Sequence, residues 1–184
     1  MDEKTKAQIM DGTKIRRVLV RLATEVIERN RNLKNLTLVG IRTRGIHLAH
    51  RLAKLIRELE GVPVPVAVLD ITPYRDDASA SPKPAARKKE EVKFSVDKKD
   101  ILLVDDVLMT GRTIRAAMEG LIDLGRPRTI QLLTFIDRGH RELPIRPDYI
   151  GKTLPTSRRE KVQVRLKESD GTDEVLITEP VKLR

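Results

Sequence analysis

Short apolar runs of strand length alternate with amphipathic helical patterns along this chain, and this alternation limits the folds that it can adopt. The clearest unit is the apolar run LTLVGI at 36–41, which is followed by the loop RTRG and by a helical pattern that starts at Ile46 and ends at Gly61. Strands that alternate with helices form a mainly parallel sheet with helices on both faces. We therefore predict an α/β fold with a doubly wound, mainly parallel sheet flanked by helices.

The remaining elements follow from the same patterns. A first helix is predicted at 13–30 with Thr13 as its N-cap, because its apolar residues recur at helical spacing. A third helix is expected from Gly111 to Leu124, closed by Gly125. We predict a single domain over 1–184, a length that one hydrophobic core can support. The other predicted strands lie at 62–71, 92–96, 101–104, 129–136, 148–151, 162–166 and 174–178.

The composition excludes several kinds of chemistry. Hydrophobic residues make up 39% of the chain but aromatic residues only 2%, so Leu, Ile, Val and Ala must form the core. The absence of cysteine excludes disulfides, thiolate catalysis and Cys-ligated zinc, and the three histidines lack the spacing of metal ligands. No segment has the apolar length of a signal peptide or of a membrane span. We therefore expect a cytoplasmic protein with no membrane partner.

Positive charge is concentrated in residues 138–165, which we call the basic span. The whole chain carries a formal net charge of +10, and the basic span holds eight Lys and Arg residues against three acidic ones, a local excess of +5. Such a surface suits a polyanion such as RNA. The alternative is an ordinary solvated basic surface with ion pairs that keeps the protein soluble.

The stretch ILLVDDVLMTGRT at 101–113 places two adjacent acids at the end of an apolar strand. In a parallel α/β sheet, ligands bind beyond the carboxyl ends of the strands, so Asp105 and Asp106 reach that edge. The glycine, the Thr hydroxyls and the helix start that follow form a cradle for a phosphate group. Acids that bind hydroxyls beside a phosphate cradle predict a sugar phosphate as ligand, whereas two acids that only cap a helix are the alternative. The spacing is not that of a Walker loop.

These segments resemble two nested families. ILLVDDVLMTGRT is similar to the phosphoribosyl-diphosphate (PRPP) signature of type I phosphoribosyltransferases. LVGIRTRGIHLAHRLA, DITPYRDD, IDRGHRELPIRPDYIGK and PTSRREKVQVRL together resemble the PyrR family of pyrimidine operon attenuation regulators, which also act as uracil phosphoribosyltransferases. The resemblance extends from about Thr13 to Ile177. It implies the type I phosphoribosyltransferase fold, with a small hood and a flexible lid loop at 72–91, although that segment also fits a plain surface loop.

The resemblance implies a role for each part of a PRPP site. Asp105 and Asp106 are the expected catalytic acids, which hydrogen-bond the ribose hydroxyls and stabilise an oxocarbenium-like state. Mg²⁺ is expected to be held mainly by the diphosphate of PRPP, with no direct protein ligand. The 5′-phosphate is assigned to Met109, Thr110, Gly111, Arg112 and Thr113; the diphosphate to Arg42, Thr43, Arg44 and Gly45; the lid contacts to Tyr74, Arg75 and Arg87; and uracil to Ile136, Asp137, Arg138 and Val162.

The resemblance also implies a second activity at the basic span. With so few aromatic side chains, RNA recognition depends on phosphate contacts, on Arg stacking and on polar contacts with the bases. Pyrimidine-operon leader mRNA is the expected partner, and UMP or UTP in the nucleotide site is expected to strengthen its binding. The expected RNA contacts are His140, Arg141, Arg146, Lys152, Thr156 and Arg158.

Three functional readings remain at this point. The first is a bifunctional uracil phosphoribosyltransferase and RNA-binding regulator that works as a homodimer or higher homo-oligomer. The second is a nucleotide-sensing regulator without catalysis, which the intact acid pair and the RTRG loop disfavour. The third is a purine-type phosphoribosyltransferase without an RNA role, which the GHRELP, DYIGK and PTS segments disfavour.

Overall fold

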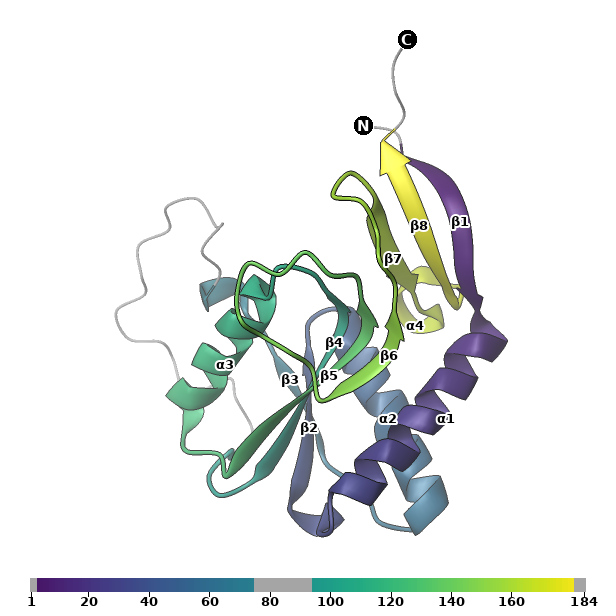
Figure 1. Ribbon diagram of the computed structural model, residues 1–184. Helices are drawn as coiled ribbons and strands as arrows, with labels where there is room; N and C mark the ends of the chain where they lie inside the picture. Colours follow the sequence, from purple (N-terminus) through teal and green to yellow (C-terminus); the bar gives the residue numbers. More distant parts are fainter. Residues whose placement is uncertain (1–2, 75–93, 181–184) are drawn as a thin grey trace.

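Five parallel strands form the central sheet of the protein (Figure 1). The computed structural model describes residues 3–74 and 94–180. Within these residues the strand order is β3-β2-β4-β5-β6, and each neighbouring pair in this sheet is parallel, which confirms the predicted α/β sheet. The strands are β2 (Leu36–Ile41), β3 (Val66–Leu69), β4 (Asp100–Leu108), β5 (Thr129–Asp137) and β6 (Tyr149–Thr153).

Three strand predictions differ substantially from the structure, whereas the bounds of β5 to β8 differ from the predicted ones by one or two residues. β3 is shorter than the predicted 62–71, because Pro63 and Pro65 lie before it, and it occupies an edge of the sheet, where a missing N–H is tolerated. The predicted strand at 92–96 is wrong for its described part, since residues 94–99 contain a bend and a turn, and residues 92–93 lie outside the described residues. β4 is longer than 101–104 and includes both acids of the signature.

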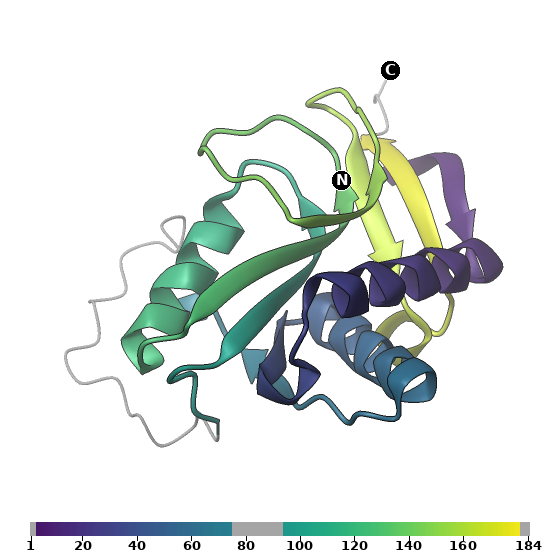
Figure 2. The ribbon, with the colours of Figure 1, turned by 60° about the horizontal axis from the view of Figure 1, so that its bottom comes forward.

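Helices cover both faces of the sheet (Figures 1 and 2). α1 (Gly12–Arg29) and α2 (Arg44–Glu60) pack on one face, and α3 (Arg112–Leu124) packs on the other, so that each face has its own apolar cluster. Leu, Ile, Val and Ala dominate both clusters as predicted, and the aromatic side chains of Phe135 and Tyr149 are also fully buried. Short 3-10 turns, η1 (Leu33–Asn35) and η2 (Thr72–Tyr74), follow α1 and β3. Among the described residues, no helix is long and apolar enough to cross a membrane.

The helix boundaries follow from local capping. α1 begins one residue earlier than predicted, and Asp11, not Thr13, is its N-cap: the Asp11 side chain accepts a hydrogen bond from the Lys14 N–H at 2.8 Å. α2 ends at Gly61 and α3 is flanked by Gly111 and Gly125, as predicted. α2 begins at Arg44, so half of the RTRG loop belongs to the first turn of that helix.

A second, antiparallel sheet forms a hood at the carboxyl end of the parallel sheet (Figure 1). Its strand order is β1-β8-β7, from β1 (Glu3–Asp11), β8 (Glu174–Pro180) and β7 (Lys161–Arg165), and the short helix α4 (Lys167–Asp170) joins β7 to β8. The sequence patterns predict β7 and β8 but not β1, which is mostly exposed and rich in charge. The hood is therefore built from both ends of the described chain.

Candidate active site and nucleic-acid interface

The two acids of the signature lie side by side in the last part of β4. Asp105 is buried, with 5% of its surface exposed, and its carboxylate accepts a hydrogen bond from the Asp106 N–H at 3.0 Å. The carboxylate of Asp106 accepts one from the Val107 N–H, also at 3.0 Å. Burial, followed by the charge of Asp106, raises the pKa of Asp105 well above its usual range. Burial also raises the pKa of Asp106, and the nearby Arg44 offsets part of that effect. In the protein without a ligand, the two carboxylates therefore have few hydrogen-bond donors to stabilise their charge.

The diphosphate loop, residues 42–45, is seated directly on the strand that carries the acids. A Cβ atom at position 45 would lie 2.4 Å from the carbonyl oxygen of Val104, so only glycine allows α2 to start this close to β4. This contact brings the loop beside the acid pair. The glycine of RTRG therefore has a packing role in addition to any contact with a ligand.

One pocket of about 270 Å³ joins the predicted groups at the carboxyl edge of the sheet. Two of its polar residues, Asp70 and Thr72, are not among the contacts assigned from the sequence, in which Thr72 is only the first residue of the predicted lid. Asp70 accepts hydrogen bonds from Thr72 and pairs with Arg42 at 3.2 Å, and these contacts lower the pKa of Asp70. Their position directly after β3 is the signal that could have identified them, because all parallel strands end at this edge. The polar lining consists of Arg42, Thr43, Asp70, Thr72, Asp105, Asp106 and Thr113.

The phosphate loop, residues 109–113, leads from β4 into α3. Gly111 has a φ of 93°, which glycine adopts without strain, and α3 begins at the next residue. The carbonyl of Thr110 accepts hydrogen bonds from the N–H groups of Glu142 and Leu143 at 3.0 and 3.1 Å. The Glu142 carboxylate also accepts a hydrogen bond from Arg112 at 2.8 Å. The phosphate loop is thus held by residues 139–145, which we call the bracing loop.

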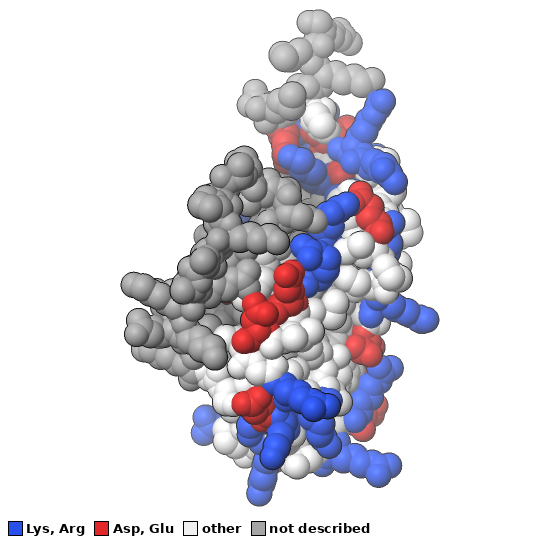
Figure 3. Space-filling model, turned by 90° about the vertical axis from the view of Figure 1, so that its left-hand side faces the viewer, with Lys and Arg blue, Asp and Glu red and all other residues white. Residues whose placement is uncertain are grey.

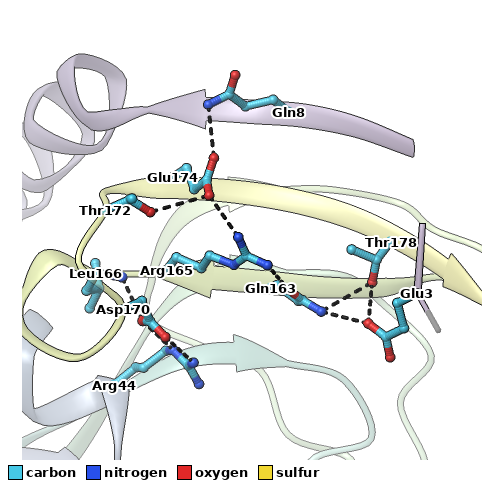
Figure 4. A network of polar contacts seen from close by, with 10 residues as sticks. All are labelled: Glu3, Gln8, Arg44, Gln163, Arg165, Leu166, Asp170, Thr172, Glu174 and Thr178. Carbon is cyan, nitrogen blue, oxygen red and sulfur yellow. Dashed lines mark hydrogen bonds and ion pairs between the residues drawn. The ribbon is translucent and has the colours of Figure 1, made fainter. Parts of the chain in front are cut away.

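A second pocket, of about 530 Å³, lies between the acid pair and the hood. Arg44 turns toward the hood and away from Arg42, and it donates two hydrogen bonds to Asp170 of α4, at 3.1 and 2.7 Å (Figure 4). Asp106 faces this pocket from one side and Val162 of β7 from the other. The Arg44 guanidinium is therefore used to hold the hood, whereas Arg42 and Thr43 line the smaller pocket.

The site and the fold can now be compared with known proteins. Residues 6–169 match the family described as phosphoribosyl transferase domain. Bifunctional protein PyrR from Pelotomaculum thermopropionicum is 57% identical over 176 residues, which cover 96% of this chain and 97% of that protein. Bifunctional protein PyrR from Deinococcus radiodurans is 54% identical over 179 residues, which cover 97% and 98%. The chain belongs to the PyrR family.

Solved structures of other phosphoribosyltransferases share the fold at much lower identity. A hypoxanthine phosphoribosyltransferase from Staphylococcus aureus has a TM-score of 0.71 and 19% identity, and the match covers 96% of this chain and 94% of that chain. The hypoxanthine phosphoribosyltransferase of Trypanosoma cruzi has a TM-score of 0.72 and 14% identity over 96% of this chain and 98% of that chain. Together with membership of the PyrR family, these matches confirm the predicted fold and the predicted bifunctional protein, a regulator and uracil phosphoribosyltransferase.

The residues predicted to contact uracil do not form one cluster in this PyrR-family chain. Ile136 is fully buried in β5, and Asp137 accepts hydrogen bonds from Arg141 at 2.7 Å and from the Gly139 N–H at 3.0 Å. Arg138 is only 5% exposed, and it donates to Thr156 and to the carbonyl groups of Ser157 and Glu160. Val162 alone of the four lines the pocket beneath the hood. The Arg138 side chain therefore shapes the loop before β7 and does not face that pocket.

The six residues predicted to contact RNA fall into two groups. Arg146, Lys152 and Arg158 are exposed. His140 and Thr156 are joined, since a ring nitrogen of His140 contacts the Thr156 carbonyl, and the Thr156 hydroxyl accepts from Arg138. Arg141 donates to three protein oxygens. Only Arg146, Lys152 and Arg158 are free of these internal contacts. The two groups differ in burial, since the residues with internal contacts are partly buried.

Positive charge is not limited to the basic span. On the face that Figure 3 shows, Lys and Arg side chains gather at the end opposite the hood, with acidic side chains among them. Charge alone therefore does not locate an RNA site on this surface.

The predicted lid lies largely outside the described residues. Arg75 and Arg87 belong to the undescribed segment 75–93. Tyr74 is described, and its hydroxyl donates to the Asp123 carboxylate of α3 at 3.2 Å while its carbonyl accepts from Arg115. Tyr74 is thus packed against α3, next to the point where the segment begins.

Proposed function

We propose that this site transfers the ribose 5-phosphate of PRPP to uracil and that the exposed residues Arg146, Lys152 and Arg158 of the basic span bind pyrimidine-operon leader mRNA. The observation that carries the catalytic part is the single pocket in which the acid pair, the diphosphate loop and Thr113 at the start of α3 converge. In this assignment, the bond from the ribose C1 to the diphosphate oxygen breaks. The bond from C1 to N1 of uracil forms, and the N1 proton is released.

The acid pair supplies the main electrostatic stabilisation in this proposal. Positive charge develops on the ribose ring as the diphosphate leaves, and two carboxylates below the ring stabilise it. The pair is buried and its pKa values are raised, so the free protein holds the charges at a cost. Two ribose hydroxyls would donate hydrogen bonds to these carboxylates and favour their charged forms. Ligand binding and charge stabilisation thus use the same two side chains.

Mg²⁺ fits the site as a partner of the substrate. The carboxylates of Asp70, Asp105 and Asp106 give the pocket the oxygen donors that this cation prefers. These three carboxylates are not arranged as a group that could hold a metal ion by itself, and no such group occurs among the described residues, so the phosphate oxygens of PRPP would supply most of the coordination. When bound, the cation neutralises the charge of the departing diphosphate.

The base pocket is assigned to the space beneath the hood. Val162 and the neighbouring backbone of β7 face Asp106 across it, and Arg44 closes one end. Membership of the PyrR family supports uracil as the base. A purine is the alternative, and it has the support of fold similarity to hypoxanthine phosphoribosyltransferases alone.

The first experiment measures UMP formation from uracil, PRPP and Mg²⁺ by the purified protein, with hypoxanthine and guanine as competing bases. We expect turnover with uracil and little competition from either purine. Turnover with a purine instead would contradict the proposed base. No turnover with any base, despite PRPP binding, would leave the regulator without an active enzyme.

For the regulatory activity we propose that UMP or UTP in the nucleotide site strengthens RNA binding. Such coupling is reciprocal, so RNA must tighten nucleotide binding by the same factor. Arg146, Lys152 and Arg158 are the exposed contacts that we assign to RNA. Because leader mRNA is bound where it is transcribed, we place the protein in the cytoplasm. We also propose that it forms a homodimer or higher homo-oligomer, as its resemblance to the PyrR family implies.

The RNA assignment is tested with a labelled transcript of the leader of the source organism's pyrimidine operon. Arg146→Ala and Lys152→Ala should each weaken binding and reduce the salt dependence of the affinity, because each removes one contact with the phosphate backbone. Arg31→Ala is the control, since Arg31 is an exposed arginine outside the basic span. Equal losses in all three variants would contradict a specific interface on the basic span.

A further inference from the structure

Arg141 connects three separate segments of the molecule through one guanidinium group. Its Nη1 donates to the carbonyl oxygen of Met109 in the phosphate loop at 2.9 Å. Its Nε donates to the carbonyl oxygen of Ile145 at 2.9 Å, and its Nη2 donates to the carboxylate of Asp137 at 2.7 Å. The side chain is 24% exposed, and its partner Asp137 is 13% exposed. Protein oxygens therefore accept from three of the five N–H donors of Arg141.

These contacts belong to a wider seam between the phosphate loop and the bracing loop. The Thr110 carbonyl accepts from two N–H groups of the bracing loop, at Glu142 and Leu143. Gly111 packs so closely on Ile145 that an added Cβ atom would lie 3.2 Å from its Cδ1 atom. A shift in the phosphate loop therefore cannot occur without a shift in the bracing loop.

The bracing loop in turn borders the exposed RNA contacts. Arg146, an exposed residue assigned to RNA, directly follows Ile145, whose carbonyl is held by Arg141. His140, which precedes Arg141, contacts the Thr156 carbonyl two residues before Arg158. Hydrogen bonds and peptide bonds therefore connect Met109, through Arg141, to these two basic residues without a gap.

We propose that Arg141 is a positioning residue that holds the phosphate loop and the RNA-facing bracing loop as one unit, and that it thereby couples nucleotide binding to RNA binding. This inference rests on the proposed function. It gives Arg141 a role different from the direct RNA contact that the sequence predicts. A bound 5′-phosphate orders the peptide groups of residues 109–111, the Met109 carbonyl keeps its bond to Arg141, and the bracing loop keeps the geometry that RNA requires.

A parallel contact is too weak to replace this link. Arg112 and Glu142 also join the two loops, but their side chains are 50% and 42% exposed. Exposed ion pairs contribute little, because water screens them and ordering two long side chains costs entropy. Arg141 is less exposed, and its planar fork meets three acceptors at fixed directions, which a lysine cannot do.

The test compares Arg141→Lys and Arg141→Ala with Arg159→Ala, which removes an exposed arginine of the basic span to which no role is assigned. Two quantities are measured: the KM for PRPP in uracil transfer, and the ratio of affinities for the labelled leader transcript with and without UMP. We expect the ratio to be at least about fivefold in the unmodified protein. In both Arg141 variants it should fall below about twofold while the KM for PRPP rises. Arg159→Ala should change neither quantity.

Other outcomes overturn the inference in distinguishable ways. If RNA affinity falls equally with and without UMP and the KM for PRPP is unchanged, Arg141 is a direct RNA contact. If stability falls but the KM and the ratio are unchanged, its role is structural only. Arg141→Lys keeps the charge and the aliphatic part of the side chain, so the test can be made with this variant if Arg141→Ala does not fold. Absence of uracil transfer in the unmodified protein contradicts the proposed enzyme activity alone, whereas absence of any UMP effect contradicts the proposed coupling and with it the role of Arg141.

Discussion

The buried carboxylate of Asp105 suits ligand binding but lowers the stability of the folded protein when it is charged. Its carboxylate is buried beside a second carboxylate, and burial raises its pKa. Because the folded protein then binds a proton more readily than the unfolded chain, the contribution of Asp105 to stability decreases as pH rises from its ordinary pKa of about 4 through the raised value. At neutral pH the folded protein therefore carries an unfavourable charge that a ligand with hydroxyl groups relieves.

Asp105→Asn should separate these two effects. We expect uracil transfer to fall by about 100-fold or more, a typical cost of removing one group that stabilises the transition state. The midpoint temperature of unfolding should rise at pH 7, because the substitution removes a buried charge, and this gain should shrink as pH is lowered toward about 4. The checks are kcat and thermal unfolding between pH 5 and 8. Unchanged turnover would show that Asp105 has no part in the chemistry.

The arginines of the basic span show what the sequence cannot provide. A charge count marks the whole segment as a surface for polyanions, but it treats every arginine alike. Arg138 is buried among carbonyl groups and Arg141 holds two loops together, whereas Arg146 and Arg158 are exposed. The difference depends on the path of the bracing loop, which follows from packing against the phosphate loop and not from any local pattern. The acid pair, in contrast, was identifiable because strand periodicity alone places it at the sheet edge.

At the scale of elements, the hood is joined to the parallel sheet by a contact between α2 and α4. Arg44 and Asp170 form a two-bond pair, and the Arg44 side chain lowers the pKa of Asp170 strongly. The same carboxylate accepts from the Leu166 N–H at 2.9 Å, which fixes the end of β7 (Figure 4). This contact ties the end of β7 to the start of α2, beside the pocket that we assign to the base.

Asp170→Asn should weaken this contact while preserving the shape of the side chain. We expect the KM for uracil to rise severalfold with a smaller change in the KM for PRPP, because Arg44 and β7 line the pocket assigned to the base, whereas Arg42 and Thr43 line the pocket assigned to the diphosphate. The stability loss should be modest, about 1 kcal/mol or less, since Arg44 is 38% exposed. Glu60→Gln, at the exposed end of α2, is a suitable control. Equal increases in both KM values would mean that the pair shapes the diphosphate loop instead.

The elements themselves were predictable to different degrees. Strands of the parallel sheet are buried on both faces, so their apolar runs are continuous, and β2 is buried along its full length. β1 has no such signal: it is an edge strand of the hood whose first four residues are all exposed. Its place depends on pairing with β8, a long-range contact that no local pattern encodes. The start of α2 was also missed, because the tight contact of Gly45 with β4 lets the helix begin inside the loop.

At the scale of the whole molecule, ion pairs tie β1 to the segment before and within β7. Lys6 pairs with Glu160, and Glu3 pairs with Lys161. The hydrogen bond from Lys6, followed by that from the Ser157 N–H, lowers the pKa of Glu160 to about 2. A carboxyl whose pKa is lowered on folding stabilises the protein above its unfolded pKa of about 4.5, and this stabilisation is lost as pH falls toward about 2.

Glu160→Gln should therefore lower the midpoint temperature of unfolding at pH 7, and the difference from the unmodified protein should decrease between about pH 4.5 and pH 2. The measurement is thermal unfolding across this range at low and at high salt, because salt screens exposed pairs. Glu28→Gln, an exposed position on α1, controls for the loss of one negative charge. A difference that stays constant with pH would contradict the role of the ionised carboxylate.

The pairing of β1 with β8 also has a consequence for the order in which the protein matures. β1 is synthesised long before β8, and β8 lies between the other two strands of the hood. At a synthesis rate of about 5 to 20 residues per second, β1 waits for its partner for roughly 10 to 30 seconds. The parallel sheet and the acid pair are complete by then, but the wall of the base pocket is not. A nascent chain whose parallel sheet is already folded therefore completes the hood, beside the pocket that we assign to the base, only after β8 has been synthesised.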